Sequence, residues 1–235
     1  MAARRRDPSR SPAPKPVDQS GRILGPRALQ TRRRLLDASA DLLAERSVRE
    51  ISVVEIARKA GTSPATFYQY FKDVPEAALR LAEEAAEEMP ALVALIDGPW
   101  HGRQGLATAR ALVDAFIRHW DAHRAVLRLR NLAAEEGDRR FQRARRVALT
   151  PVLEHLAARV TEFQRAGRVS KELHPYAAAA ALASILERLA AYHTELEYFG
   201  ASREQLVETC ARILLQSVTG RCGDVPPRSK LRGQS

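Results

Sequence analysis

The chain has 235 residues, of which 45% are hydrophobic and 28% charged, proportions typical of a globular protein with one good core or two small ones. The net charge of +10 lies at the ends: residues 1–34 hold ten basic and two acidic side chains, residues 221–235 hold four and one, and the segment between them has a net charge of −1. Two cysteines and no C-x-x-C pair argue against a disulfide framework or a zinc-thiolate site, and no apolar run reaches about 18 residues, so we expect a cytoplasmic protein with no membrane partner.

The first 27 residues combine an Arg4–Arg6 run with many prolines, a composition that predicts a disordered basic arm. Residues 29–45 follow with leucines at helical spacing and predict a first helix. Three arginines, Arg32–Arg34, lie near its start, where cations oppose the helix dipole. They are candidates for phosphate contacts, or form an ordinary surface cluster.

The stretch from Ser52 to Phe71 holds two helix starts and one tight turn. Ser52 and Glu55 have the spacing of a capping box, and Gly61 follows as a residue that ends a helix at no steric cost. Ser63 then caps a second short helix with proline in its first turn. The phenylalanines at 67 and 71 are spaced for burial, so the other faces present small, hydroxyl and amide side chains. Two short helices joined in this way predict a helix-turn-helix.

The pattern I-A-x-x-A-G-x-S-x-x-T-x-Y-x-x-F at Ile56–Phe71 resembles the DNA-binding signature of the TetR family of bacterial transcriptional regulators. The resemblance covers roughly residues 31–88 and implies that the second short helix reads a double-stranded DNA operator. It implies contacts to bases or the thymine methyl from Ala65, Thr66 and Tyr68, a base-edge contact from Gln69, and phosphate contacts from Ser63, Tyr70 and Lys72. Val54 and Val74 depart from the family pattern, in which polar or basic residues contact phosphate, and Lys72 or the basic arm would replace them.

Helical patterns continue to residue 219, and no strand pattern competes with them. Asp73 and Glu76 have cap spacing and open a helix expected to reach Glu88. Further helices are expected over residues 104–119, 123–132, 138–165, 175–198 and 202–218. We therefore predict an all-α protein with four parts: a disordered basic arm (1–27), a three-helix helix-turn-helix DNA-binding domain (28–88), a helical ligand-binding and dimerisation domain (89–220), and a disordered basic tail (221–235).

The family resemblance also implies a homodimer, formed by the last two long helices at about 175–197 and 202–218, and an apolar pocket for a small lipophilic ligand among the middle helices. Each apolar residue on these helices would equally suit a plain core. Candidates for the pocket wall are Phe116, Trp120, Leu127, Phe141, Leu153, Leu189 and Tyr192, with His119 and His193 as polar groups beside them.

Catalytic signatures are weak, so we expect neither an enzyme nor a cofactor. There is no glycine-rich phosphate loop and no G-x-S-x-G motif. His119 and His123 are four residues apart on one helix, a spacing that could bind a metal, but no third ligand is spaced to join them, so no metal site is predicted. Cys210 lies on an apolar helical stripe and is expected in the core.

Together these patterns predict a TetR-like, ligand-responsive repressor that binds a palindromic operator as a homodimer. Two alternatives stay open: a small-molecule-binding helical protein without operator specificity, and a nonspecific DNA-binding protein whose affinity comes from its basic arms.

Overall fold

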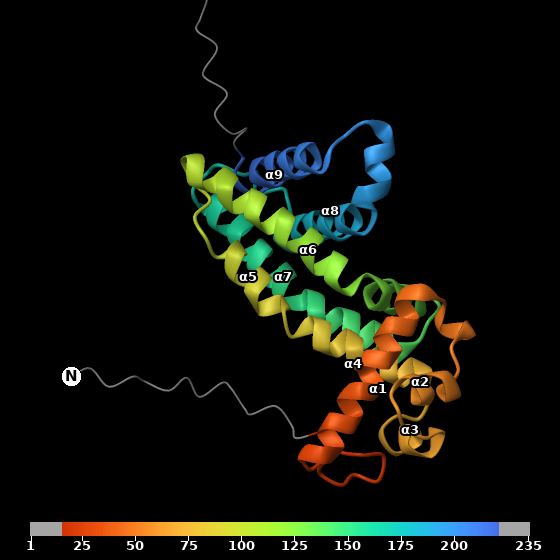
Figure 1. Ribbon diagram of the computed structural model, residues 1–235. Helices are drawn as coiled ribbons and strands as arrows, with labels where there is room; N and C mark the ends of the chain where they lie inside the picture. The colour runs from red at the N-terminus through yellow and green to blue at the C-terminus, as the bar shows by residue number, and fades with distance from the viewer. Residues whose placement is uncertain (1–15, 221–235) are drawn as a thin grey trace, which may run out of the picture. The chain divides into compact units, whose positions relative to one another are not determined.

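The computed structural model describes residues 16–220, which are almost entirely helical (Figure 1). The predicted tail (221–235) and the first 15 residues of the predicted arm lie outside the described residues. The helices are α1 (Pro26–Glu45), η1 (Val48–Glu50), α2 (Val53–Lys59), α3 (Pro64–Tyr70), α4 (Val74–Ala86), α5 (Met89–Ile96), α6 (Gly102–Glu135), α7 (Arg139–Arg165), α8 (Pro175–Leu196), η2 (Glu197–Phe199) and α9 (Arg203–Thr219). The all-α prediction is confirmed. The residues form two compact units that divide between Arg80 and Leu81, inside α4.

In the N-terminal unit, side-chain caps set the helix boundaries. The Glu55 amide donates to the Ser52 hydroxyl at 3.2 Å, and the Glu55 carboxylate accepts from the Ser52 amide at 2.9 Å, which confirms the predicted capping box of α2. Gly61 follows with a φ of +62°, a left-handed conformation in which a side chain would be strained. The Ser63 hydroxyl accepts from the Thr66 amide at 3.2 Å and so begins α3.

The core of this unit is formed where α1 packs against α2 and α3. Each of these helices contributes side chains that are fully or almost fully buried: Leu35, Leu36, Ile56, Phe67 and, just after α3, Phe71. Helix α1 starts at Pro26, three residues before the expected start, because proline suits the first turn of a helix. The helix-turn-helix is therefore anchored on one long helix.

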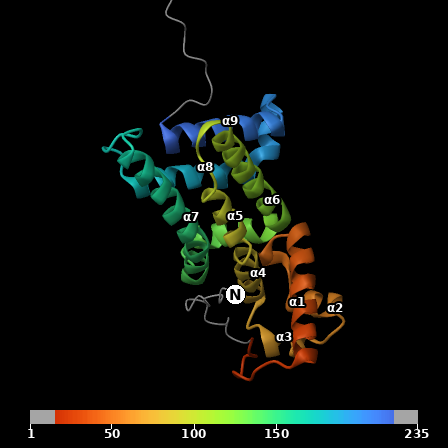
Figure 2. The same ribbon diagram turned by 90° about the vertical axis from the view of Figure 1, so that its left-hand side faces the viewer.

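In the C-terminal unit, α6 is the central helix and contacts α5, α7, α8 and α9 (Figures 1 and 2). Its apolar face enters the main core of the unit through Leu112, Val113, Phe116, Ile117 and Trp120. Helices α8 and α9 run side by side and also contact α7. This arrangement leaves one face of α8 and one face of α9 exposed to solvent.

Two further helix boundaries differ from the expectation. The helix expected to reach Glu88 ends at Ala86, and Met89–Ile96 forms the separate helix α5, because Pro90 occupies the first turn of a new helix rather than only ending the old one. The segments expected at 104–119 and 123–132 join into α6, which has a non-helical residue at the junction: His123 has φ −124° and ψ 20°.

Within residues 16–220, no helix combines the length and apolar character needed to cross a lipid bilayer.

The cap of α2 generates a pH-dependent prediction. Hydrogen bonds from the Ser52 amide and hydroxyl, with help from Arg46, lower the pKa of Glu55 from 4.5 to about 2. Because the folded-state pKa is depressed, the stabilisation by this carboxylate is complete above about pH 4.5 and is lost as the pH falls toward 2.

We expect Glu55→Gln, which keeps an acceptor but removes the charge, to lower the thermal midpoint at pH 7. The thermal midpoints of the variant and the unmodified chain should differ progressively less at lower pH. Circular dichroism melts at several pH values measure this, with Glu45→Gln as the control; an equal difference at all pH values contradicts the prediction.

Candidate functional site

Helix α3 presents a polar face on top of a buried aromatic pair. Phe67 and Phe71 are buried with ring centroids 5.4 Å apart, and the guanidinium of Arg32 from α1 lies 5.6 Å from the Phe71 ring centroid. A helix of seven residues is too short to be stable alone, so these contacts hold it in place. The buried phenylalanines therefore determine which face of α3 points to solvent.

The seven residues predicted to contact DNA all belong to this helix or flank it. Five of them are exposed to solvent: Ser63, Ala65, Tyr68, Gln69 and Lys72. The other two, Thr66 and Tyr70, are half-buried. The Ser63 hydroxyl also lies 3.0 Å from the Thr66 hydroxyl. A phosphate contact by this hydroxyl would therefore be made in addition to its hydrogen bonds within the cap of α3. The structure therefore brings the predicted set together on one surface, and the contacts themselves stay predictions.

The two positions that depart from the family pattern differ in their surroundings. Val74 is 7% exposed and belongs to the core, so no phosphate contact from its side chain is possible. Val54 is 59% exposed at the start of α2. Two nearby basic side chains form ion pairs within the unit: Lys59 pairs with Asp41 at 3.2 Å, and Arg46 pairs with Glu55 at 2.9 Å.

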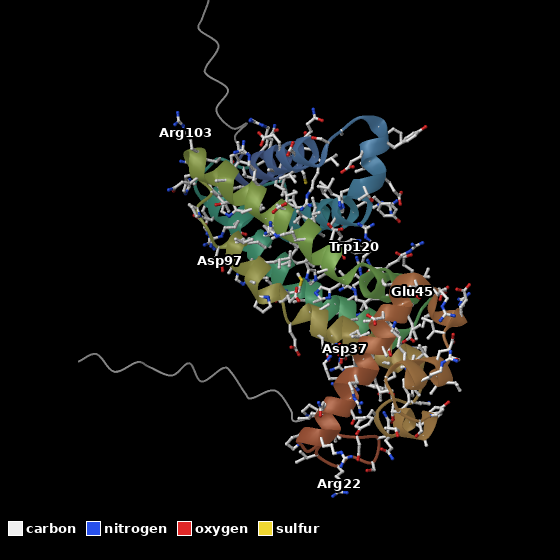
Figure 3. The ribbon with its side chains drawn as sticks, in the orientation of Figure 1. Arg22, Asp37, Glu45, Asp97, Arg103 and Trp120 are labelled. Carbon is white, nitrogen blue, oxygen red and sulfur yellow. The ribbon has the colours of Figure 1, made fainter. Side chains whose placement is uncertain are left out.

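Sequence reasoning missed a contact between the predicted arm and α3. Residues 16–25 form a turn closed by an antiparallel bridge between Val17 and Ile23. The Gln19 amide donates to the Gln69 carbonyl at 2.9 Å, and its side-chain amide donates to the Tyr70 carbonyl at 3.1 Å. The exposed Arg22 extends from this turn (Figure 3). The D-Q-S-G sequence at 18–21 is the turn signal that could have revealed it.

Hydrogen bonds around Asp18 stabilise that turn. Its carboxylate accepts from the Ser20 hydroxyl at 2.6 Å and from the amides of Ser20 and Arg22, each at 2.9 Å. These bonds, the Ser20 hydroxyl first, lower the pKa of Asp18. The side chain is therefore ionised in the neutral range, and the turn keeps its acceptor there.

The C-terminal unit gathers five of the seven predicted ligand-wall residues in or against its main core: Phe116, Trp120, Leu127, Leu153 and Leu189. Phe141 is buried outside this cluster. Tyr192 is half-buried beneath the guanidinium of Arg188, 3.8 Å from its ring centroid. The ligand role of these seven residues stays a prediction.

An apolar cavity of about 300 Å³ lies elsewhere in this unit, and none of those seven residues lines it. Pro151, inside α7, has no amide hydrogen, so the Val147 carbonyl one turn earlier lacks its usual helical donor; both residues line the cavity. The Asp97 carboxylate, at its edge, lies 2.8 Å from the His155 ring nitrogen. Residues from the end of α4, from α5 and its following turn, and from α7 form the wall: Ala86, Met89, Pro90, Val93, Ala94, Asp97, Val147, Ala148 and Pro151.

Charged and polar groups are also buried in this unit. Glu187 forms ion pairs with Arg145 at 2.6 Å and with the buried Arg130 at 3.5 Å. Burial lowers the pKa of Arg130 to about 10. His193, one of the two polar groups expected beside the ligand, is buried on α8. Burial raises the pKa of the Cys210 thiol to about 11, which agrees with the predicted core position.

The two histidines for which the sequence offered no third ligand, His119 and His123, meet the carboxylate of Glu88. Burial lowers the pKa of His119. Burial alone would raise the pKa of Glu88, but hydrogen bonds from His123 and His119 lower it. Because Glu88 is 31 and 35 residues away along the chain, local spacing could not reveal it.

Exposed faces of α8 and α9 carry small, polar and apolar side chains at helical spacing. On α8 the exposed face includes Ala177, Ala181, Ser184 and Ile185, and on α9 it includes Thr209, Ile213 and Gln216. Ile185 and Ile213 are 38% and 44% exposed. Such faces can approach a second helix pair closely.

Comparisons with solved structures agree with this fold. A regulator FadR from Bacillus subtilis, solved with stearoyl-CoA, has a TM-score of 0.56 at 16% identity over 80% of this chain and 98% of its own. SmeT, the repressor of the Stenotrophomonas maltophilia multidrug efflux pump SmeDEF, has a TM-score of 0.56 at 17% identity over 83% of this chain and 94% of its own.

Sequence comparisons identify the family. A Haemophilus influenzae protein described as an uncharacterized HTH-type transcriptional regulator is 43% identical over 67 residues, a match that spans 27% of this chain and 33% of that protein's length. The family model for bacterial regulatory proteins of the tetR family matches residues 35–73, and the model for the tetracyclin repressor-like C-terminal domain matches residues 92–224. With both its helix-turn-helix and its helical C-terminal unit matched, the chain belongs to the TetR family of transcriptional regulators.

Proposed function

We propose that this regulator is a ligand-responsive repressor that binds a palindromic operator as a homodimer. The observation that carries the proposal is the exposed polar face of α3, held outward by the burial of Phe67 and Phe71. Hydroxyl and amide side chains on such a helix suit hydrogen bonding to base edges in the major groove. The similarity to SmeT, which is described as a repressor, supports this direction of regulation.

A homodimer is required if the operator is palindromic, because two recognition helices must reach half-sites about 34–36 Å apart. The exposed faces of α8 and α9 support this role. Each carries an isoleucine among small or polar residues, and a two-fold axis would pair the two faces with copies of themselves. The C-terminal unit would then set the spacing of the two recognition helices.

The ligand is proposed to be apolar, and the cavity between α5 and α7 is the candidate site because eight of its nine lining residues are apolar. The FadR structure with stearoyl-CoA supports an acyl-type ligand. For release from DNA, the ligand must bind the conformation that cannot span both half-sites more tightly than the one that can. Equal affinity for both states would leave operator occupancy unchanged.

Selection from random duplex DNA at fixed salt, with the full-length chain, tests the proposal. Recovery of a two-fold symmetric sequence supports a dimeric, sequence-specific repressor. If the selection recovers nothing above background, both alone and with acyl-CoA present, the first alternative is favoured. That alternative is a small-molecule-binding protein without operator specificity.

Replacing Gln69 should relax specificity at one position of the operator half-site. A good base-edge contact contributes about 1–3 kcal/mol of discrimination, so Gln69→Ala should weaken binding by roughly that amount for the preferred base and far less for the others. Fluorescence anisotropy with a set of single-base operator variants measures this. Gln104→Ala, at an exposed position near the start of α6, is the matched control, and equal weakening for every operator variant would refute base reading by Gln69.

Placing charges on the exposed α8 and α9 faces should break the dimer. Ile185→Asp with Ile213→Asp would bury unpaired carboxylates in the interface, so we expect dimerisation to weaken by about tenfold or more and operator binding to fall with it. Light scattering after size exclusion gives the mass. Leu132→Asp, at a similarly exposed leucine of α6, is the control; an unchanged dimer in the double variant would refute this interface.

Removing residues 1–15 separates sequence-specific binding from arm-driven binding. The cut removes five basic side chains but keeps Gln19 and its hydrogen bonds to α3. A sequence-specific repressor should keep its operator preference, while the slope of log affinity against log salt falls by about 0.9 for each phosphate that the shortened chain no longer neutralises. An arm-driven binder should show almost no affinity for any sequence after the cut.

A further inference from the structure

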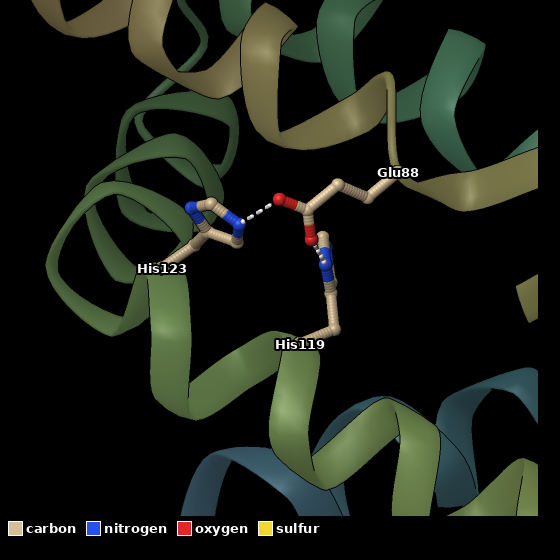
Figure 4. Close-up of side chains that lie close together, drawn as sticks. All are labelled: Glu88, His119 and His123. Carbon is tan, nitrogen blue, oxygen red and sulfur yellow. Dashed lines mark hydrogen bonds and ion pairs between the residues drawn. The ribbon is translucent and has the colours of Figure 1, made fainter. Parts of the chain in front are cut away.

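The carboxylate of Glu88 and the imidazoles of His119 and His123 form a cluster in the C-terminal unit (Figure 4). Glu88 lies in the turn between α4 and α5, and both histidines lie on α6. One carboxylate oxygen lies 3.1 Å from His119 Nδ1, and the other lies 2.9 Å from His123 Nε2. All three ligand atoms lie within 4.8 Å of one another.

These groups match the donor set of a divalent transition metal. Zinc binds histidine nitrogen and carboxylate oxygen at about 2.0–2.2 Å, so two ligand atoms on a tetrahedral ion are about 3.3 Å apart. Each nitrogen lies close to that separation from one of the two carboxylate oxygens. Because all three ligand atoms lie within 4.8 Å of one another, side-chain rotations that draw them closer would place an ion between the three groups. Two imidazoles and one carboxylate favour zinc, cobalt, nickel or iron over magnesium or calcium, which prefer oxygen ligands only.

We propose that Glu88, His119 and His123 form a binding site for a divalent transition metal ion, with water completing the coordination. Glu88 is largely exposed, with its side chain 54% accessible, so solvent and an incoming ion can reach the carboxylate. The site rests on geometry within the C-terminal unit and does not depend on the proposed operator or acyl ligand.

The surrounding structure holds the two histidines in place. The His119 side chain is only 8% exposed, on the stretch of α6 that also carries the core residues Ile117 and Trp120, so its ring has little freedom. His123 sits at the one residue where the helical backbone of α6 is interrupted, with φ −124° and ψ 20°.

A bound ion would link the turn after α4 to the centre of α6. Three coordinate bonds would replace two hydrogen bonds, and Glu88 would become fixed relative to both histidines. An ion that binds the folded unit and not the unfolded chain raises its stability by mass action. The thermal unfolding of the C-terminal unit should therefore depend on the metal concentration, and the fluorescence of Trp100 and Trp120 reports on that unit alone because it contains both tryptophans of the chain.

The test titrates Co²⁺ into untagged, metal-stripped, full-length protein and follows the visible absorption of the ion. We expect saturation at one ion per chain, displacement by Zn²⁺, no displacement by excess Mg²⁺, and a higher thermal midpoint by tryptophan fluorescence with Co²⁺ or Zn²⁺. Binding that does not saturate at one ion per chain, or that excess Mg²⁺ abolishes, overturns the proposal.

Two variants and one control locate the ion. Glu88→Gln preserves side-chain shape, and His123→Ala removes a partly exposed ring; each should weaken Co²⁺ binding by about tenfold or more. His155→Ala is the matched control, because His155 also pairs with a carboxylate, that of Asp97 at 2.8 Å, but belongs to no group of three ligands within residues 16–220. Wild-type affinity in Glu88→Gln and His123→Ala, with unchanged circular dichroism, places the ion elsewhere and refutes the site.

Discussion

The burial of Phe67 and Phe71 is the interaction on which the N-terminal unit depends most. Helix α3 has seven residues, and isolated helices shorter than about 12–15 residues are marginal in water, so tertiary packing has to stabilise it. Both rings are almost completely buried, and their burial contributes about 1.5–3 kcal/mol each. The same packing forces Ala65 and Gln69 to the outside, so the stability of α3 and the direction of its proposed DNA-reading face have one cause.

Features that depend on neighbouring residues could be read from the sequence. The capping box at Ser52 and the cap at Ser63 join atoms at most three residues apart, and the structure has both of them. The family signature lies in this same local region, which is why the helix-turn-helix was predicted correctly. The interruption of α6 near His123 was also visible, as a break between two helical patterns.

Features that depend on distant residues could not be read in this way. Pro90 has the same local meaning whether it ends one helix or begins the next, and only packing against α6 and α7 makes Met89–Ile96 a helix of its own. Gln19 reaches the carbonyl of Tyr70 across 51 positions, and Glu88 reaches His123 across 35. Neither pair has a spacing that a periodic pattern could reveal, because the fold and not the helix period brings the partners together.

The cavity between α5 and α7 also depends on residues that are distant in the sequence. Large apolar residues at helical spacing, such as Phe116 and Trp120, are the residues that best fill space, and the structure buries both in the main core. A cavity requires missing volume, which arises where small or kinked positions face one another. The wall of the α5–α7 cavity has Ala86, Ala94 and Ala148 with two prolines, a set that carries no strong hydrophobic periodicity. Large apolar residues at helical spacing therefore predict a core, whereas this cavity could not be read from them.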